Sequence, residues 1–100
     1  MSIAHWAGGE GPRDKLLERG ARALSDAELL AVLLRTGTRN CNALELARSL
    51  LSQFGGLAGV MRVDGPRLMA CPGMGAAKFA QLRAALELAR RQALQAISTG

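Results

Sequence analysis

Residues 68–82, Leu-Met-Ala-Cys-Pro-Gly-Met-Gly-Ala-Ala-Lys-Phe-Ala-Gln-Leu, restrict the possible folds more than any other stretch of this chain. Two glycines that flank one apolar residue separate a short apolar segment from a long amphipathic segment. Because glycine tolerates positive φ and lets another backbone come close, residues 72–75 predict a tight connection between two helices. The first amides of the second helix, at Gly75, Ala76 and Ala77, have no partners within that helix. With the helix dipole behind them, these amides attract an anion such as phosphate.

The same stretch resembles the helix-hairpin-helix motif of proteins that hold DNA by its backbone. The positions that match the motif are Leu68, Cys71, Gly73, Met74, Gly75 and Leu82. The stretch departs from the motif at Phe79, where the family usually has a small alanine packed against the first helix. We therefore expect either a slightly opened hairpin or a contact made by Ala80 instead. The alternative interpretation is a plain glycine-rich turn between two core helices.

Start and stop signals divide the rest of the chain into short helices. Pro12 and Gly20 favour a helix between them, because proline fits the first helical turn and glycine fits the end. A serine or asparagine followed three residues later by glutamate predicts capping boxes at Ser25 and Asn42. The expected helices are residues 12–19, 26–35, 43–54 and 57–62, a short helix capped by Asp64 with Pro66 in its first turn, and residues 76–91.

These signals predict an all-α fold, a compact bundle of about five helices that contains the hairpin. The apolar residues are mostly alanine and leucine and tyrosine is absent, a composition that favours helices over sheets. The helix over residues 26–35 is apolar nearly all round, so we expect it at the centre of the bundle. The last helix is expected to face the core with a stripe of Phe79, Leu82, Leu86, Ala89 and Ala93.

A chain of 100 residues forms one domain. Residues 1–11 are predicted to be a flexible arm because they are rich in glycine, with Trp6 anchoring the arm on the folded body rather than stacking on a nucleic-acid base. Residues 12–91 are the predicted helical domain, with the hairpin at residues 66–91. Residues 92–100 drift toward Ser, Thr and Gly and are expected to fray or to begin a linker.

Several classes of protein are disfavoured by the composition. The longest apolar run, residues 29–34, is far shorter than the roughly 20 residues that span a bilayer, and no secretory signal is visible. Cys41 and Cys71 are far apart, which suits two reduced thiols and a cytoplasmic location. The single His5 cannot form a metal cluster. No nucleophile–base pair or pair of acids is evident, so we expect no enzyme, no cofactor and no small-molecule substrate.

The positive charge is concentrated in the half of the chain that contains the hairpin. The net charge is +5; residues 1–50 hold seven Lys/Arg against six Asp/Glu, and residues 51–100 hold six against two. An excess of this kind is expected for a phosphate-binding surface, and it is also common on ordinary helical domains.

The order of the segments resembles the N-terminal region of the bacterial RadC family over residues 12–91. Besides the hairpin, the matching segments are Pro12-Arg13-Asp14-Lys15-Leu16-Leu17, Ala23-Leu24-Ser25-Asp26-Ala27-Glu28-Leu29-Leu30, Leu33-Leu34-Arg35-Thr36-Gly37-Thr38, Leu46-Ala47-Arg48 and Leu86-Glu87-Leu88-Ala89-Arg90. Departures include Asp14, where a glutamate is usual, and the glycines of the arm. The resemblance implies a helical accessory domain with a DNA-repair label. It also implies a second, C-terminal domain of the JAB/MPN type with a zinc site, whose metal ligands we do not expect among these 100 residues.

Two functions are compatible with these observations. The first is a non-sequence-specific DNA-binding module that grips the phosphate backbone, with candidate contacts at Gly73, Met74, Gly75, Ala76, Lys78, Arg83, Thr38 and Arg39. The second is a protein-interaction or scaffolding domain that docks the C-terminal JAB/MPN-type domain or another repair factor.

Overall fold

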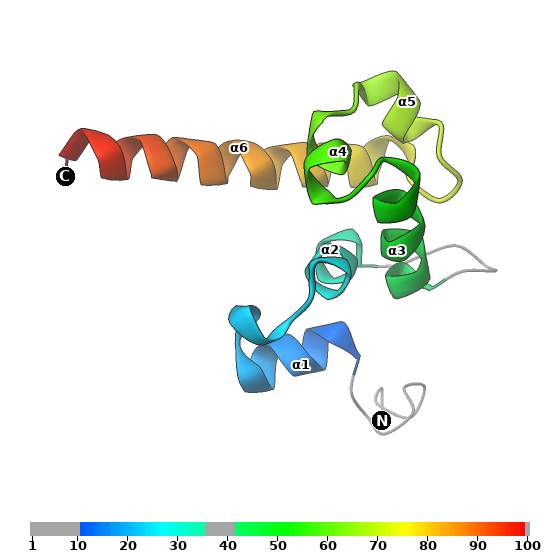
Figure 1. Cartoon of the computed structure of the whole chain (residues 1–100), viewed down its shortest axis with the longest axis horizontal. Helices are drawn as coiled ribbons and strands as arrows, with labels where there is room; N and C mark the ends of the chain where they lie inside the picture. Colours follow the sequence, from blue (N-terminus) through cyan, green and yellow to red (C-terminus); the bar gives the residue numbers. More distant parts are fainter. Residues whose placement is uncertain (1–10, 36–41, 100) are drawn as a thin grey trace.

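The computed structural model describes residues 11–35 and 42–99, and every regular element in these ranges is helical (Figure 1). The elements are α1 (Pro12–Arg19), the 3₁₀ turn η3 (Ala21–Ala23), α2 (Asp26–Leu34), α3 (Ala43–Gln53), α4 (Leu57–Arg62), α5 (Gly65–Met69) and α6 (Gly75–Thr99). The all-α prediction is therefore confirmed. Residues 1–10, which include Trp6, and the candidate residues Thr38 and Arg39 lie outside the described residues. Gly11, the last residue of the predicted arm, is buried and precedes α1.

Two capping boxes begin the helices that form the centre of the fold. At the start of α2, the backbone N–H of Glu28 donates to Ser25 Oγ at 3.2 Å, and the Ser25 N–H donates to Glu28 Oε1 at 2.8 Å. At the start of α3, the Glu45 N–H donates to Asn42 Oδ1 at 2.8 Å, and the Asn42 N–H donates to Glu45 Oε1 at 3.0 Å. These reciprocal bonds satisfy helix-end donors that would otherwise lack partners, so both predicted helix starts are confirmed.

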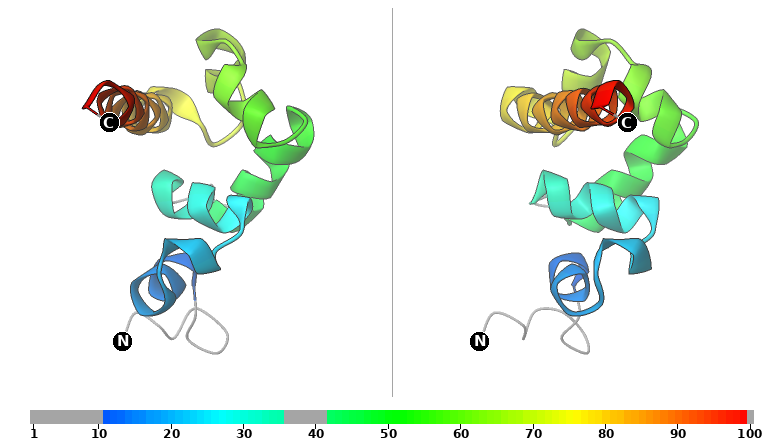
Figure 2. Two further views of the ribbon diagram at one scale, coloured as in Figure 1. Left: turned by 60° about the vertical axis from the view of Figure 1, so that its left-hand side comes forward. Right: turned by 90° about the vertical axis from the view of Figure 1, so that its left-hand side faces the viewer.

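The core lies where α2 and α3 pack together and where α6 covers them. Its buried side chains are Leu30, Ala31, Leu34, Leu46, Ala47, Leu50, Val60, Val63, Leu68, Cys71, Met74 and Leu82. In all views α2 lies between α1 and α6, which agrees with its predicted central position (Figure 2). Leu29 on α2 nevertheless remains 40% exposed, because α1 covers its side of α2 incompletely. No residue of α1 is fully buried.

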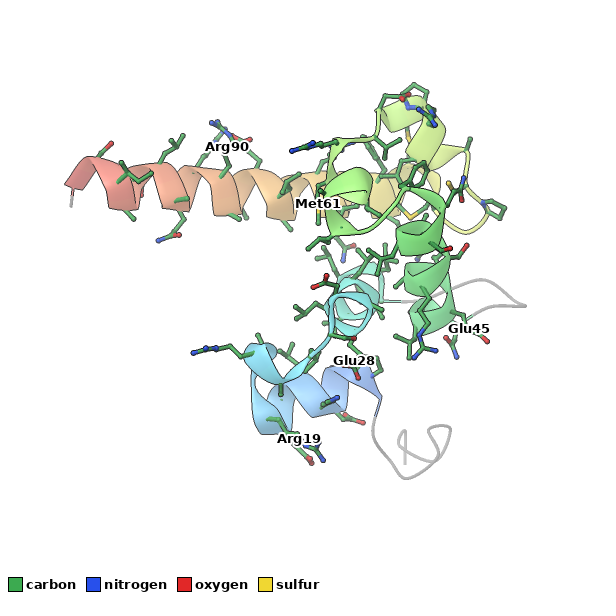
Figure 3. All side chains as sticks on the ribbon, viewed as in Figure 1. Arg19, Glu28, Glu45, Met61 and Arg90 are labelled. Atoms are coloured by element: carbon green, nitrogen blue, oxygen red, sulfur yellow. The ribbon has the colours of Figure 1, made fainter. Side chains whose placement is uncertain are left out.

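The last helix is longer than expected. It continues through Thr99 instead of ending near Arg91, because the alanines, leucines and glutamines beyond Arg91 are strong helix formers and no glycine or proline interrupts them. Its far half projects away from the body, and the Arg90 side chain lies on this projecting part (Figures 1 and 3). The predicted core stripe is buried at Leu82 only; Ala89 and Ala93 are exposed because no other element reaches them within the described residues.

Candidate nucleic-acid interface

The connection between α5 and α6 is a tight turn that requires glycine at two positions. Gly73 has φ 91° and Gly75 has φ 59°, both in the left-handed region that other residues rarely adopt. The N–H of Met74 donates to the Cys71 carbonyl at 3.0 Å, which closes the turn. The side chain of Met74 is buried in the core at 2% exposure. Met74 therefore holds the turn in place, and neither its side chain nor its amide is available to a ligand.

The first turn of α6 leaves open the amides on which the candidate site depends. Gly75, Ala76 and Ala77 are exposed, and within the described ranges their N–H groups donate to no backbone carbonyl. Among the described residues, no atom lies within 4 Å of a Cβ placed on Gly75, so none of them fills this side of the helix start. The positive end of the α6 dipole is located here.

Two cationic residues from different parts of the chain lie beside this helix start. Lys78 is half-buried in the first turn of α6, and Arg35 is the exposed residue that ends α2. Both line an open pocket of about 220 Å³, together with Leu34, Ala77 and Gln81. The pocket therefore combines positive side chains with the unpaired end of a helix.

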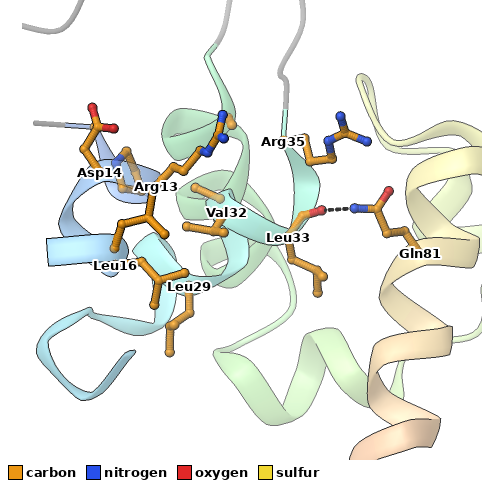
Figure 4. A pocket seen from close by; sticks show the side chains of 13 residues that line it. Arg13, Asp14, Leu16, Leu29, Val32, Leu33, Arg35 and Gln81 are labelled. Atoms are coloured by element: carbon orange, nitrogen blue, oxygen red, sulfur yellow. Dashed lines mark hydrogen bonds between the residues drawn. The ribbon is translucent and has the colours of Figure 1, made fainter. Parts of the chain in front are cut away.

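A hydrogen bond fixes the relative position of the two helices that form this pocket. Gln81 Nε2 donates to the Leu33 carbonyl at 2.5 Å, and Figure 4 shows Arg35 beside this contact. Arg35 has φ 72°, an unusual value for a residue with a side chain, at the point where the chain leaves α2. Arg35 was not among the candidate residues from sequence, because nothing in the sequence indicates that the end of α2 meets the first turn of α6.

The guanidinium group of Arg83 contacts other groups of the protein. Its Nη1 donates to the Met61 carbonyl at 3.0 Å, and its Nη2 donates to the Val63 carbonyl. The guanidinium group also stacks on the Phe79 ring. Its Nε is buried and has no hydrogen-bond acceptor in the described part of the chain. Arg83 thus connects α6 to the end of α4, and its guanidinium group is engaged by other groups of the protein.

The departure from the hairpin motif at Phe79 is accommodated by a glycine. Ala80 is exposed and does not take the contact that the motif assigns to a small residue. The Phe79 ring lies against Gly65 at the start of α5, where an added Cβ would be 3.0 Å from Phe79 Cζ. The absence of a side chain at Gly65 therefore makes room for the aromatic ring between α5 and α6.

A second concave surface lies between α1 and α2 (Figure 4). It has a volume of about 880 Å³ and is lined by Gly11, Pro12, Arg13, Asp14, Leu16, Leu17, Leu29, Ala31, Val32, Leu33, Arg35, Ala43 and Gln81. Its lining is largely aliphatic, and two of its rim residues, Gly11 and Arg35, border residues outside the described ranges. Within the described ranges, no three His, Cys, Asp or Glu side chains gather as metal ligands.

The fold and the site define a class of protein: a small all-α domain whose glycine turn presents an exposed, positively flanked helix start. The UPF0758 N-terminal family matches residues 3–80. The chain therefore belongs to the UPF0758 family, which is the RadC family indicated by the sequence motifs.

Relatives of known sequence extend well beyond the region they share with this chain. It is 55% identical over all of its 100 residues to UPF0758 proteins of Shewanella sp. (strain W3-18-1) and Shewanella baltica (strain OS155), and 54% identical to one of Shewanella sp. (strain MR-4). It spans 44% of the length of each of these relatives. No solved structure matches the chain. Among the described helices, none has the length and apolar character needed to cross a membrane.

Proposed function

We propose that this domain binds DNA without sequence specificity by seating a backbone phosphate on the exposed amides at the start of α6. The observation that carries the proposal is the combination of exposure and missing backbone acceptors at Gly75, Ala76 and Ala77. A helix start of this kind is a ready site for a phosphate, because its N–H groups and its dipole both favour negative charge.

The flanking cations support a polyanion as the ligand. Lys78 and Arg35 line the same pocket beside the helix start and add two positive charges to it. Residues 51–100, which include the helix start, hold six Lys/Arg against two Asp/Glu. Phosphate contacts position a protein on DNA without reading its sequence, so the proposal includes no base recognition. It assigns no catalysis, cofactor or small-molecule substrate to this domain.

The proposal has a salt-dependent signature. Each neutralised phosphate contributes a slope of about −0.9 to the plot of log affinity against log salt concentration for duplex DNA. Contacts by the amide site, Lys78 and Arg35 would therefore give a slope of roughly −2 to −3. A location in the cytoplasm, where DNA is accessible, and a role in DNA repair are parts of the same proposal.

The test is fluorescence anisotropy of labelled duplex and branched DNA across a salt series. Aspartate at Gly75 would strain the backbone because of its φ of 59°, so the better variant is Ala76→Asp. An acidic residue in the first turn stabilises a helix, yet here it places negative charge where the phosphate would lie. We expect Ala76→Asp to weaken DNA binding at least about fivefold at low salt, because the new carboxylate would repel the phosphate next to it.

The matched control for charge is Ala84→Asp. Ala84 is also an exposed alanine of α6, but it lies more than two turns beyond the helix start. We expect this variant to bind nearly as well as wild type. Equal DNA binding by wild type and Ala76→Asp would show that the start of α6 does not bind the phosphate. No binding by wild type at low salt would reject the DNA-binding function.

A second candidate function is a scaffolding domain that docks a C-terminal JAB/MPN-type domain or another repair factor. One specific observation favours it: the far half of α6 projects from the body (Figure 1). Its large apolar side chains Leu88, Leu94 and Ile97 are exposed. This surface is separate from the helix start, so the two functions are compatible with each other.

A further inference from the structure

We propose that the outer half of α6, residues 88–98, is a docking surface for the polypeptide that follows this domain in full-length UPF0758 proteins. The inference names the surface for the second candidate function and rests on that function. It is independent of DNA binding, which involves the opposite end of the same helix.

The outer half of α6 has the exposure of a segment that lacks its partner. Every residue from 88 to 98 is exposed, including Leu88 at 69%, Leu94 at 49% and Ile97 at 77%. Isolated helical segments are marginal in water, because most helical stability in proteins comes from packing an apolar face. Ion pairs of Glu87 with Arg90 and Arg91 lie at the start of this segment.

The sequence of α6 indicates which side of the helix docks. Leu82 is buried against the body, and the same stripe continues through Leu86 to Ala89, Ala93 and Ile97 at spacings of three and four residues. We call Ala89, Ala93 and Ile97 the outer apolar face. The two alanines let a neighbouring backbone come close, and Ile97 supplies a large apolar anchor. Leu88 lies two and a half turns from Ile97, at about 3.6 residues per turn, and so points to the opposite side.

The length of the relatives supports the following polypeptide as the occupant. This chain covers 44% of their length and matches the N-terminal family region, so more than half of each relative lies outside the shared region, and the family description indicates that it follows. In those proteins the following polypeptide emerges close to the end of α6 at Thr99. A partner tethered by a short linker has an effective concentration in the millimolar range, so it needs a smaller contact than a separate molecule does. A second copy of the chain lacks this advantage and needs an interface of roughly 1,000 Å² or more.

The test is hydrogen exchange measured by mass spectrometry on the full-length protein and on residues 1–100. We expect the amides of residues 88–98 to exchange at least about tenfold more slowly in the full-length protein, since docking must be broken before they open. In the full-length protein, Ile97→Glu should return this exchange to the rate of residues 1–100. The matched control Leu88→Glu, with similar exposure on the opposite side, should keep the protection.

Four outcomes would overturn the inference. Equal effects of Ile97→Glu and Leu88→Glu would reject the outer apolar face. Protection confined to the groove between α1 and α2 would keep a docking function but place it elsewhere. No protection anywhere in the domain would reject both the surface and the docking function. Protection in residues 1–100 alone that increases with protein concentration would identify a second copy as the occupant.

Discussion

The guanidinium carbon of Arg83 lies 4.9 Å from the centroid of the Phe79 ring, one turn earlier on the same helix. The same guanidinium donates to the carbonyls of Met61 and Val63, where α4 ends. These contacts hold α6 at a fixed position relative to α4 and α5. The orientation of the helix start at Gly75 therefore depends on a residue that lies more than two turns away from it.

Arg83→Lys should destabilise the domain although it keeps the positive charge. Lysine has no planar fork and cannot reach two carbonyls while stacking on the ring. Losing hydrogen bonds from a charged donor is expected to cost about 1.5–3 kcal/mol of the free energy of unfolding, measured by urea denaturation. The control Arg90→Lys, at an exposed ion pair, should change it by less than about 1 kcal/mol. Equal effects of the two substitutions would contradict a structural role for Arg83.

Gly65→Ala should lower the free energy of unfolding only while Phe79 is present. The new Cβ would lie 3.0 Å from Phe79 Cζ, which is too close for ordinary packing. In a Phe79→Ala background the clash is absent, and alanine is then the better helix former by up to about 1 kcal/mol. A double-mutant cycle on unfolding free energies should give a coupling of roughly 0.5–3 kcal/mol. Additive effects would show that the ring and the glycine do not depend on each other.

Lys15→Met should loosen α1 while leaving the rest of the fold intact. Lys15 Nζ donates to Glu28 Oε2 at 3.1 Å, and this pair links α1 to the capping box of α2. The helix has no fully buried residue, so this ion pair adds to apolar contacts that are only partly buried. We expect the amides of α1 to exchange with solvent faster in the variant, with those of α3 unchanged. Unchanged exchange in α1 would show that its apolar contacts alone hold it.

The outer half of α6 should lose stability on acidification. Hydrogen bonds from Arg90, and then from Arg91, lower the pKa of Glu87 from its ordinary value of 4.5 to about 2. Because this pKa is lower in the folded chain, the carboxylate contributes stability above about pH 4.5, and that contribution is lost as the pH falls toward 2. Helicity measured by far-UV circular dichroism should therefore fall over this interval. The fall should be smaller in Glu87→Gln; an identical acid profile for the two proteins would contradict the role of Glu87.

Much of the fold could be predicted from sequence because its helix boundaries are set by local chemistry. The capping boxes at Ser25 and Asn42 and the proline at the start of α1 act within a few residues of where they occur. The end of α6 was predicted wrongly, since a drift toward Ser and Thr does not stop a helix that contains no breaker. The exposure of Ala89 and Ala93 was missed for another reason: apolar spacing shows which face of a helix is apolar but not whether another element covers it.

The candidate site was only partly predictable for a related reason. The turn at Gly73 and Gly75 is a local feature, and its positive φ angles are confirmed. The positions of Arg35 and Arg83 depend on contacts between distant segments. Arg35 lies beside Lys78, whereas Arg83 donates hydrogen bonds to the carbonyls of Met61 and Val63. Spacing along the chain contains no information about either contact.

Amide chemical-shift mapping by NMR, during titration with duplex DNA at low salt, tests phosphate binding at the start of α6. The amide signals of Gly75, Ala76 and Ala77 should move first and furthest and should return toward their free positions when salt is added. The signals of residues 88–98 should not move. Shifts that cluster elsewhere while these three amides stay unchanged, or no shifts at any DNA concentration, would contradict binding at this helix start.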